Sequence, residues 1–586
     1  MRFFRAGALA ASVSAASALK NNTYDYIVVG GGPSGIITAE RFAEAGKNVL
    51  LLERGVGPTV STGNNETLSW NRTLTPIDVP GLSADIANLD VWNQYMCTDT
   101  DGTAACVLGG GVTVNYMVFV HPPDHDFDDK WPQGWKWEDV QSASQRLYQR
   151  NPGTTQPSAD GNRYDQGLYK VLSKFFNQLG WRSVDMIAAP NEKHQIYSYP
   201  SWNIVNEKRA GPVRTYLPLV KDADNFTLRL NSKVNRLVRS GSEVTGVEVV
   251  DAVTGKTEVV TLAPHGRVVL AAGALSTPRV LFNSGIGPKK QIETAKKSGV
   301  AVPPQEEWID LPVGVGLKDH PIFTINVDTG ADFGLLDYDS IVNGSDTTDI
   351  NLYRQNSGVL TQGKHRMIFF TSNQVNGHTR YYQGSCAPAD EGVVSITAYM
   401  THGLTSEGLL GLDEKGNTVI EQSPYLTTAE DRTAAKLFID QILYDITDSS
   451  TGFKLQGNTN TSAILASPSV GVHYVGTAKM GTDDGRKNGT SVVDTNTKVY
   501  GMDNLVSWIV KCLSVRFANC CSMLSMAVCT LISRRVTSKP PSWLLPSMLL
   551  LRFLPSTKHV YHGYHYLASG RNRFTLDGID NLSFIG

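Results

Sequence analysis

The pattern of apolar residues near the N-terminus predicts a strand, a turn, a helix and a second strand in immediate succession. Residues 26–30 read YIVVG, a short apolar run rich in β-branched side chains that is typical of a buried strand. Apolar side chains then recur at helical spacing through IITAERFAEAG, residues 36–46, and the pattern ends at Gly46. NVLLLE, residues 48–53, predicts a second buried strand. Residues 24–55 are therefore expected to form a β-α-β unit.

Three glycines follow the first strand at the spacing G-x-G-x-x-G, which is typical of dinucleotide-binding turns when it occurs in this context. Gly30 permits the tight turn, Gly32 lets the backbone approach a pyrophosphate, and Gly35 lets helix and strand pack closely. The helix N-terminus offers N–H groups to phosphates, and Glu53 can accept hydrogen bonds from ribose hydroxyls. A glycine turn without a ligand does not explain Glu53, although the unit alone does not separate FAD from NAD. The predicted contacts in this unit are Gly30, Gly32, Pro33, Ser34, Gly35, Glu53 and Arg54.

Further along the chain the periodicity differs from one segment to the next. Residues 225–262 alternate apolar and polar side chains, which predicts a β-meander packed on the dinucleotide fold. Residues 267–287 predict a buried strand, a small-residue turn and a helix. Segments 126–204 and 322–455 mix helix-like and strand-like stretches without dinucleotide features, and we expect them to form one discontinuous substrate domain.

Length and charge narrow the class of protein. A chain of 586 residues exceeds one compact core, so two or more domains are expected. The formal net charge is −2, and the bulk charge therefore favours neither nucleic acid nor an anionic membrane as a partner. No stretch before residue 506 is long and apolar enough to span a bilayer.

The N-terminus has the features of a secretory signal peptide. A basic start with Arg2 and Arg5 precedes a short Ala-rich stretch, so we expect a signal peptide over residues 1–18, cleaved after Ala18. A buried N-terminal helix is the alternative. We therefore expect a secreted, extracellular glycoprotein. The N-x-S/T sites that agree with secretion are Asn21, Asn65, Asn71, Asn225, Asn343, Asn460 and Asn488.

Residues 467–481, SPSVGVHYVGTAKMG, place His473 among apolar and small residues. A side chain with a pKa near neutrality suits general-base catalysis. A core histidine satisfied by its neighbours is the alternative, and the local pattern alone favours that interpretation.

HPPDHDFDD, residues 121–129, contains His121, Asp124 and His125, which are metal-ligating types. No further ligands are positioned nearby in the sequence, so a solvated loop is favoured and no metal is predicted.

Several motifs together resemble the glucose–methanol–choline (GMC) flavin oxidoreductases. They are the glycine turn, CVLGGGVTVNYMVFV (106–120), RVVLAAGALSTPRVLFNSGIG (267–287) and LPVGVGLKDHP (311–321), in the order typical of the family. The resemblance covers about residues 24–505. Three further segments look closest to the flavin domain of cellobiose dehydrogenase: WPQGWKWEDV, NEKRAGPVRTYL and PPQEEWIDLPVG.

The resemblance implies an α/β fold: a Rossmann-like FAD-binding domain with a discontinuous α+β substrate domain. It assigns FAD as the cofactor and His473 as the base that accepts the substrate hydroxyl proton while hydride passes to flavin N5. The substrate would be a small sugar or alcohol, and the electrons would leave to oxygen, a quinone or a redox protein. Further FAD contacts implied are Gly110, Gly111, Asn115 and the backbone near Val234. The implied FAD-binding domain comprises 22–125, 205–321 and 456–505, and the substrate domain 126–204 and 322–455.

Some residues depart from the patterns of that family. Tyr116 follows Asn115 where a small residue is usual. Val472 and Leu409 stand where cellobiose dehydrogenases have a sugar-binding asparagine and arginine, which disfavours a disaccharide. The dinucleotide fold begins just after the signal, so no haem domain is expected before it.

The chain changes character at Val506. The period is lost there, and residues 506–536 hold four of the seven cysteines. Of the other three, Cys97 and Cys106 can close a small loop in an oxidising compartment, whereas Cys386 has no evident partner.

The family continues after this point with a strand, a V-D step and P-T-G-N, whose asparagine partners the histidine. This segment is absent, yet the codons of residues 525–554, taken one frame over, permit it. We therefore interpret residues 506–586 as an aberrant, frame-shifted tail, with a genuine divergent tail as the alternative. A flavin-binding pseudoenzyme is accordingly the alternative function, and an NAD-dependent dehydrogenase rests on the first motif only.

Overall fold

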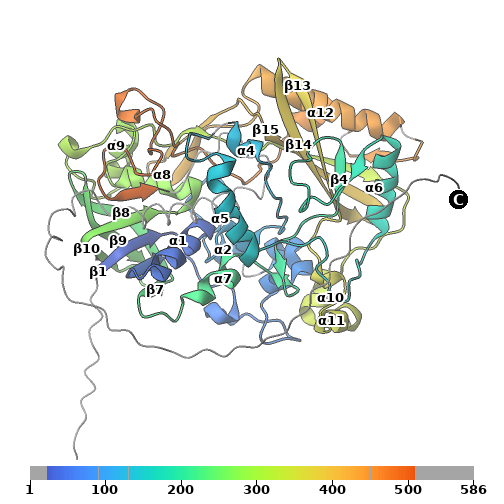
Figure 1. Ribbon diagram of the computed structural model, residues 1–586, viewed down its shortest axis with the longest axis horizontal. Helices are drawn as coiled ribbons and strands as arrows, with labels where there is room; N and C mark the ends of the chain where they lie inside the picture. Colours follow the sequence, from blue (N-terminus) through green and yellow to red (C-terminus); the bar gives the residue numbers. More distant parts are fainter. Residues whose placement is uncertain (1–22, 90–91, 130, 449, 458, 508–586) are drawn as a thin grey trace, which may run out of the picture. The chain divides into compact units, whose positions relative to one another are not determined.

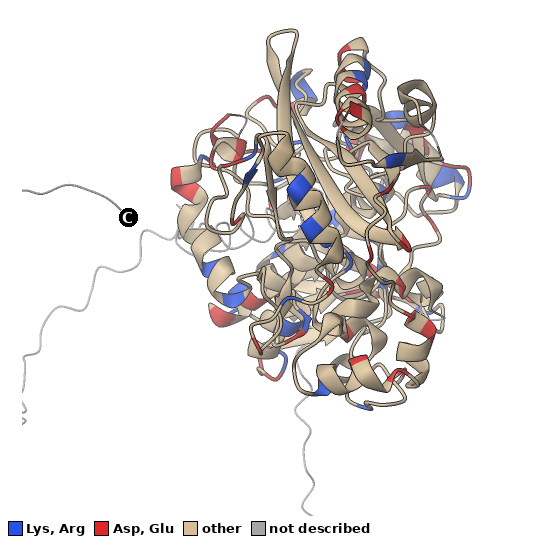
Figure 2. Cartoon of the chain, turned by 90° about the vertical axis from the view of Figure 1, so that its right-hand side faces the viewer, with Lys and Arg blue, Asp and Glu red and all other residues tan. Residues whose placement is uncertain are grey.

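The computed structural model describes residues 23–89, 92–129, 131–448, 450–457 and 459–507. The predicted signal peptide and all of the predicted tail after Ser507 lie outside the described residues. Within the described ranges, no helix combines the length and apolar character needed to cross a membrane. On the face shown in Figure 2, basic and acidic residues are interspersed, in keeping with the net charge of −2.

The first sheet contains the predicted β-α-β unit (Figure 1). β1 lies between β2 and β10 with parallel pairing on both sides, and the helix α1 (Pro33–Glu44) connects β1 to β2. The strand order is β7-β2-β1-β10-β9-β8, and β19 also pairs with β10. The strands are β1 (Thr23–Val29), β2 (Val49–Leu52), β7 (Phe226–Arg229), β8 (Ser232–Ser240), β9 (Glu243–Asp251), β10 (Thr257–Leu270) and β19 (Leu505–Ser507). The Rossmann-like arrangement expected from the sequence is confirmed.

The predicted meander is part of this sheet and does not pack on it as a separate layer. β8, β9 and β10 pair antiparallel in succession. β10 lies between β1 and β9: residues 261–262 and 267–270 pair with β1 on one edge, and residues 257–261 pair with β9 on the other. The alternation of side chains predicts a strand but not which neighbouring strand it pairs with.

The tail predicted to begin at residue 506 contributes its first two residues to the same sheet. Val506 and Ser507 are buried and pair in parallel with Val269 and Leu270 of β10. The sheet therefore continues two residues beyond the predicted boundary at 505, because the exposed edge of the second half of β10 accepts β19.

The second large sheet has the order β18-β12-β15-β14-β13-β4-β3 and is mainly antiparallel. Its strands are β3 (Arg182–Ser183), β4 (Ile196–Ser198), β12 (Ile322–Asp328), β13 (Met367–Val375), β14 (His378–Asp390), β15 (Val393–His402) and β18 (Lys454–Gln456). The helices α6 (Gly167–Gln178) and α12 (Ala429–Asp448) pack on one face and form a second hydrophobic core, in which Tyr382 stacks on Phe438 with ring centroids 4.1 Å apart (Figure 1).

The remaining elements are short and connect or cover these two sheets. Two small sheets contain β11 (Val315–Leu317), β16 (Gly408–Leu412) and β17 (Thr418–Gln422), and β5 (Ile204–Val205) with β6 (Lys208–Arg209). The other helices are α2 (Trp92–Tyr95), α3 (Gly111–Val114), α4 (His125–Asp128), α5 (Trp137–Arg150), α7 (Pro212–Thr215), α8 (Gly273–Asn283), α9 (Lys289–Lys297), α10 (Tyr338–Asn343), α11 (Thr347–Arg354) and α13 (Thr461–Ala466).

A disulfide joins Cys97 to Cys106 and closes the loop between them, and Cys386 is a buried free thiol in β14.

Closing a loop of this length reduces the entropy of the unfolded chain. Replacing both Cys97 and Cys106 by serine is therefore expected to lower the free energy of unfolding by about 2–3 kcal/mol. The measurement is the denaturation midpoint with and without dithiothreitol. The reductant should lower the midpoint of the wild type and leave that of the double variant unchanged. Equal midpoints for the oxidised and reduced wild type would contradict the prediction.

Candidate functional site

A cavity of about 820 Å³ is lined both by the carboxyl end of the first sheet and by one face of the second sheet. This volume lies within the range of sites that hold small molecules and cofactors. Its walls include all the residues predicted to contact the cofactor except Gly35, and they include His473. The tertiary structure therefore brings the predicted dinucleotide site and the predicted base to one place.

The first glycine turn packs tightly on one side and is open to the cavity on the other. A Cβ atom at Gly30, where φ is +104°, would lie 2.5 Å from the carbonyl oxygen of Ala271, and one at Gly35 would lie 1.8 Å from that of Gly30. At Gly32 a Cβ atom would meet nothing within 4 Å. The N-terminus of α1 follows at Pro33, so its N–H groups lie beside this open space, as pyrophosphate binding requires.

The second glycine turn is hydrogen-bonded to the first and packs against it. The N–H of Gly109 donates to the carbonyl of Gly31 at 2.7 Å, and a Cβ atom at Gly110 would come within 3.1 Å of the Cα atom of Gly32. Gly110 and Gly111 line the cavity and begin the short helix α3. The two glycine segments, 74 or more positions apart in the chain, thus form one continuous wall.

Asn115 ends α3 and is held by a residue that sequence reasoning missed. Its side-chain oxygen accepts hydrogen bonds from the N–H of Met117 at 3.0 Å and from the Arg209 guanidinium at 3.1 Å. The same guanidinium nitrogen donates to the Asn115 carbonyl at 2.8 Å. Arg209 is buried, and it orients Asn115 along the cavity wall. Local sequence gives no signal for this contact, because the two residues lie 94 positions apart.

Glu53 is buried at the end of β2 and connects two loops of the site. One carboxylate oxygen accepts from the N–H of Gly31 at 2.7 Å, and the other accepts from that of Gly55 at 2.8 Å. Burial raises the pKa of Glu53, and these two hydrogen bonds oppose the shift. Each carboxylate oxygen can accept further hydrogen bonds, so the predicted contact with ribose hydroxyls is compatible with this geometry.

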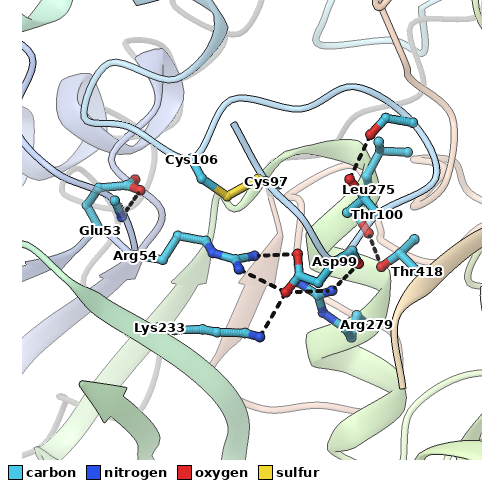
Figure 3. Close-up of a disulfide and its surroundings, with 12 residues drawn as sticks. Glu53, Arg54, Cys97, Asp99, Thr100, Cys106, Lys233, Leu275, Arg279 and Thr418 are labelled. Atoms are coloured by element: carbon cyan, nitrogen blue, oxygen red, sulfur yellow. Dashed lines mark hydrogen bonds and ion pairs between the residues drawn. A yellow bond between two sulfur atoms is a disulfide. The ribbon is translucent and has the colours of Figure 1, made fainter. Parts of the chain in front are cut away.

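Three cations that line the cavity surround the carboxylate of Asp99 (Figure 3). Arg54 binds it with two hydrogen bonds of 3.0 and 2.8 Å, Lys233 lies at 2.8 Å, and Arg279 lies at 3.1 Å. Burial would raise the pKa of Asp99, but the hydrogen bonds and charges of these cations outweigh it and hold the pKa well below its usual value. Three positive charges against one negative charge favour an anionic ligand at this wall.

This cluster changes the interpretation of Arg54, and it contains the sequence neighbour of Val234. Arg54 lines the cavity as predicted, but its guanidinium is bound to Asp99, which the sequence did not indicate. Val234 lies on the edge strand β8 beside Lys233 and also lines the cavity. The members of the cluster are 45 or more positions from Asp99, so no local motif identifies them.

His473 lies on the cavity wall in the loop between Ser469 and Val475. Its ring centroid is 5.5 Å from that of His320 and 6.5 Å from that of Tyr399. Burial, followed by the charge of His320, lowers the pKa of His473 well below 6.5. The imidazole is therefore neutral at physiological pH, the state in which it can accept a proton.

A row of hydroxyl groups lies on the part of the cavity wall that the second sheet provides. Thr324 of β12 pairs with Thr397 of β15, which pairs with Ser385 of β14, and all three line the cavity. Gln383 and Tyr399 occupy the next row. These residues were missed, although the period-two pattern of Ser395, Thr397 and Tyr399 between apolar neighbours carries the signal of a strand with one polar face.

The segment 121–129 is not the solvated loop that the sequence predicted. His121 is buried and stacks on Tyr148 with ring centroids 3.9 Å apart, and Asp126 of α4 is buried as well. Burial lowers the pKa of His121 to about 4. Among the described residues, no group of three or more His, Cys, Asp and Glu side chains is placed to hold a metal ion.

Comparisons with known proteins identify the family. Residues 24–322 match the N-terminal and residues 406–507 the C-terminal family model described as GMC oxidoreductase. An oxygen-dependent choline dehydrogenase of Photobacterium profundum is 28% identical over 326 residues, which are 51% of this chain and 52% of that protein. Pyranose dehydrogenase 3 of Leucoagaricus meleagris is 26% identical over 343 residues, which are 52% of each protein. The chain thus spans about half the length of these curated relatives.

A solved structure of Aspergillus oryzae formate oxidase, in a study of its FAD modification, has the same fold. The TM-score is 0.68 at 17% identity, and the match covers 88% of this chain and 98% of that one. The open glycine turn, the helix N-terminus and the cationic wall at Asp99 fit the charged and extended FAD molecule. Since the first family model alone matches more than half of the sequence, the chain belongs to the GMC oxidoreductase family, whose cofactor is FAD.

Proposed function

We propose that this chain oxidises a CH–OH group of a small alcohol or sugar, with His473 as the general base. The observation that carries this proposal is that one cavity joins the FAD wall, His473 and the hydroxyl row of the second sheet. FAD, when bound, supplies the hydride acceptor. The neutral imidazole of His473 accepts the proton of the substrate hydroxyl, and the row of Thr324, Thr397 and Ser385 offers hydrogen bonds to its other polar groups.

The substrate wall combines polar and apolar features. Val470 and Val472 have exposed apolar side chains and line the cavity together with the hydroxyl-bearing strands. Leu409, which stands where cellobiose dehydrogenases have an arginine, belongs to β16 and does not line the cavity. A sugar or a partly apolar alcohol is compatible with such a wall. One similar protein is named for choline, an alcohol, and another for pyranose, a sugar, so both substrate classes occur among the relatives. The likeness to cellobiose dehydrogenase stays a proposal.

The experiment is anaerobic mixing of the holoenzyme with cellobiose, other sugars and aliphatic or aromatic alcohols, followed by the visible absorbance of the flavin. Bleaching by one class is expected and identifies the substrate class. Flavin that stays oxidised with every donor, but is bleached by dithionite, would instead favour the pseudoenzyme. Sequencing the transcript across the codons of residues 505–525 establishes which C-terminus the assayed protein should carry.

The pH dependence of flavin reduction provides a separate prediction. A base that must be neutral is lost when it is protonated, and a lowered pKa moves that loss to more acidic pH. The rate constant is therefore expected to keep its plateau as the pH falls through 6.5, the ordinary pKa of histidine, and to fall only well below it. Stopped-flow reduction over the pH range in which the protein stays folded tests this. An acidic limb centred near 6.5 would show that His473 titrates normally or is not the base.

We also propose that the protein is secreted and passes its electrons to oxygen, a quinone or a redox protein. The signal-peptide pattern and the N-x-S/T sites support secretion. One of these sites is unsuited to carry a glycan: the Asn225 amide donates to the carbonyls of Ala43 at 2.8 Å and Lys47 at 2.9 Å. Mass spectrometry of the secreted protein before and after enzymatic deglycosylation should find glycans at other sites and none at Asn225.

A further inference from the structure

The loop that carries His473 is longer than the segment against which it pairs. Backbone hydrogen bonds join Lys318 to Val475 in both directions, and Ile322 to Ser469 in both directions. Between these two bridges lie residues 319–321 on one side and residues 470–474 on the other. The His473 side thus holds two extra residues, whose N–H groups cannot all pair with the opposite backbone.

The carboxylate of Asp319 accepts hydrogen bonds from N–H groups of this longer segment. One oxygen accepts from His473 at 2.8 Å, and the other accepts from Gly471 at 2.9 Å and Val472 at 3.0 Å. The hydroxyl of Tyr425 donates to the same carboxylate, and Asp319 itself is 2% exposed. Hydrogen bonds from N–H groups to a buried carboxylate are among the stronger ones in proteins.

The conformation of Val472 shows that the loop does not hold this shape unaided. Val472 has φ of +58°, in the left-handed region, where a β-branched residue is an outlier. Its side chain is 42% exposed and borders the cavity, so it gains little from burial. Gly471 lies tightly against the opposite segment, since a Cβ atom there would lie 2.5 Å from the carbonyl oxygen of His320. The three N–H bonds to Asp319 are the interactions that favour this backbone.

We propose that Asp319 is a positioning residue: its carboxylate clamps the backbone of residues 471–473 and thereby places the His473 imidazole at the cavity wall. Asp319 does not line the cavity, and it acts through the backbone of His473 without touching a substrate. The catalytic part of this inference rests on the proposed role of His473 as the base. The clamp itself does not, and it can be tested without turnover.

The first test is hydrogen exchange of the holoenzyme and its Asp319→Asn variant. An asparagine amide presents a donor where two N–H groups need an acceptor. The amides of residues 471–473 should therefore exchange about 10-fold faster or more, a factor that corresponds to the net worth of one hydrogen bond. Gly471→Ala should loosen the same amides without changing Asp319. Exchange of these amides in Asp319→Asn at the wild-type rate would overturn the clamp, whether or not the protein oxidises any donor.

The second test is the rate constant of flavin reduction by the best donor. A displaced base is expected to lower this rate constant about 10- to 100-fold in Asp319→Asn, with little change in the dissociation constant of the donor. Adding Val472→Gly, which adopts the left-handed region readily, should recover part of the loss. A loosened loop with an undiminished rate, or a loss with no recovery by Val472→Gly, would overturn the positioning role.

Asp431 provides a matched control. It is also a buried carboxylate that accepts loop N–H groups, from Thr405 at 3.0 Å and Ser406 at 2.8 Å, and it does not line the cavity. Asp431→Asn should loosen its own loop and leave flavin reduction unchanged. A wild type with exchange-protected 471–473 amides but no reduction by any donor would refute the proposed function and retain the clamp.

Discussion

Replacing His473 by alanine is expected to lower the rate constant of flavin reduction by about 10²–10⁴-fold, the usual contribution of a positioned general base. The imidazole lines the cavity, and its pKa lies well below the ordinary value, so the neutral form that the variant removes is the populated one. The bound flavin should keep its visible spectrum, because the glycine walls do not depend on this side chain. Stopped-flow absorbance with the donor found above measures the loss.

The matched control is His194→Ala. His194 lies outside the cavity, and its Nδ1 atom accepts a hydrogen bond from the N–H of Ser372 at 3.2 Å. This variant should reduce its flavin at the wild-type rate. If His473→Ala reduced its flavin as fast as His194→Ala, the base would have to be sought elsewhere in the cavity.

Replacing Gly32 by aspartate is expected to weaken FAD binding by about 10²–10⁴-fold without unfolding the protein. A Cβ atom at Gly32 meets nothing within 4 Å, so the side chain fits the fold but enters the space in which we expect the pyrophosphate to lie. A carboxylate there repels the phosphates and displaces them from the α1 N–H groups. Two lost charge-assisted hydrogen bonds, at roughly 1.5–3 kcal/mol each, account for this range.

FAD titration of the apoprotein, followed by flavin fluorescence, measures the loss of affinity. Gly334→Asp is the control, because Gly334 is exposed, lies outside the cavity and also has no atom within 4 Å of an added Cβ. Gly35→Ala provides a contrast: its Cβ atom would lie 1.8 Å from the carbonyl oxygen of Gly30, so this variant should lose folded protein as well as FAD. Wild-type affinity in Gly32→Asp would place the pyrophosphate elsewhere.

The dinucleotide half of the site could be predicted from the sequence because the residues that form it lie close together along the chain. Gly30, Gly32 and Gly35 must sit at fixed offsets in one turn, and Glu53 must end the adjacent strand. Short-range spacing of this kind survives in a one-dimensional pattern. The same holds for the loop of Cys97 and Cys106, whose ends are nine positions apart.

Other features have no local signature. Asp99 meets Arg279 from 180 positions away, and Asp319 meets His473 from 154 positions away. His121 begins an aspartate-rich segment that predicts an exposed loop, yet it is buried, and Tyr148 of α5 stacks on its ring. In each case the partner comes from a different element, so the residue type alone leaves both its burial and its role open.

The sequence by itself determined the β-α-β unit and its dinucleotide-binding turn, since strand and helix periods and glycine spacing are properties of neighbouring residues. FAD and the candidate base His473 came from the resemblance of several motifs to the GMC family. Only the tertiary structure decided that β8–β10 extend the same sheet, that three cations gather on Asp99, and that Asp319 holds the loop of His473. Those arrangements depend on which distant segments pack together, because buried charges and unpaired N–H groups must find partners wherever the fold supplies them.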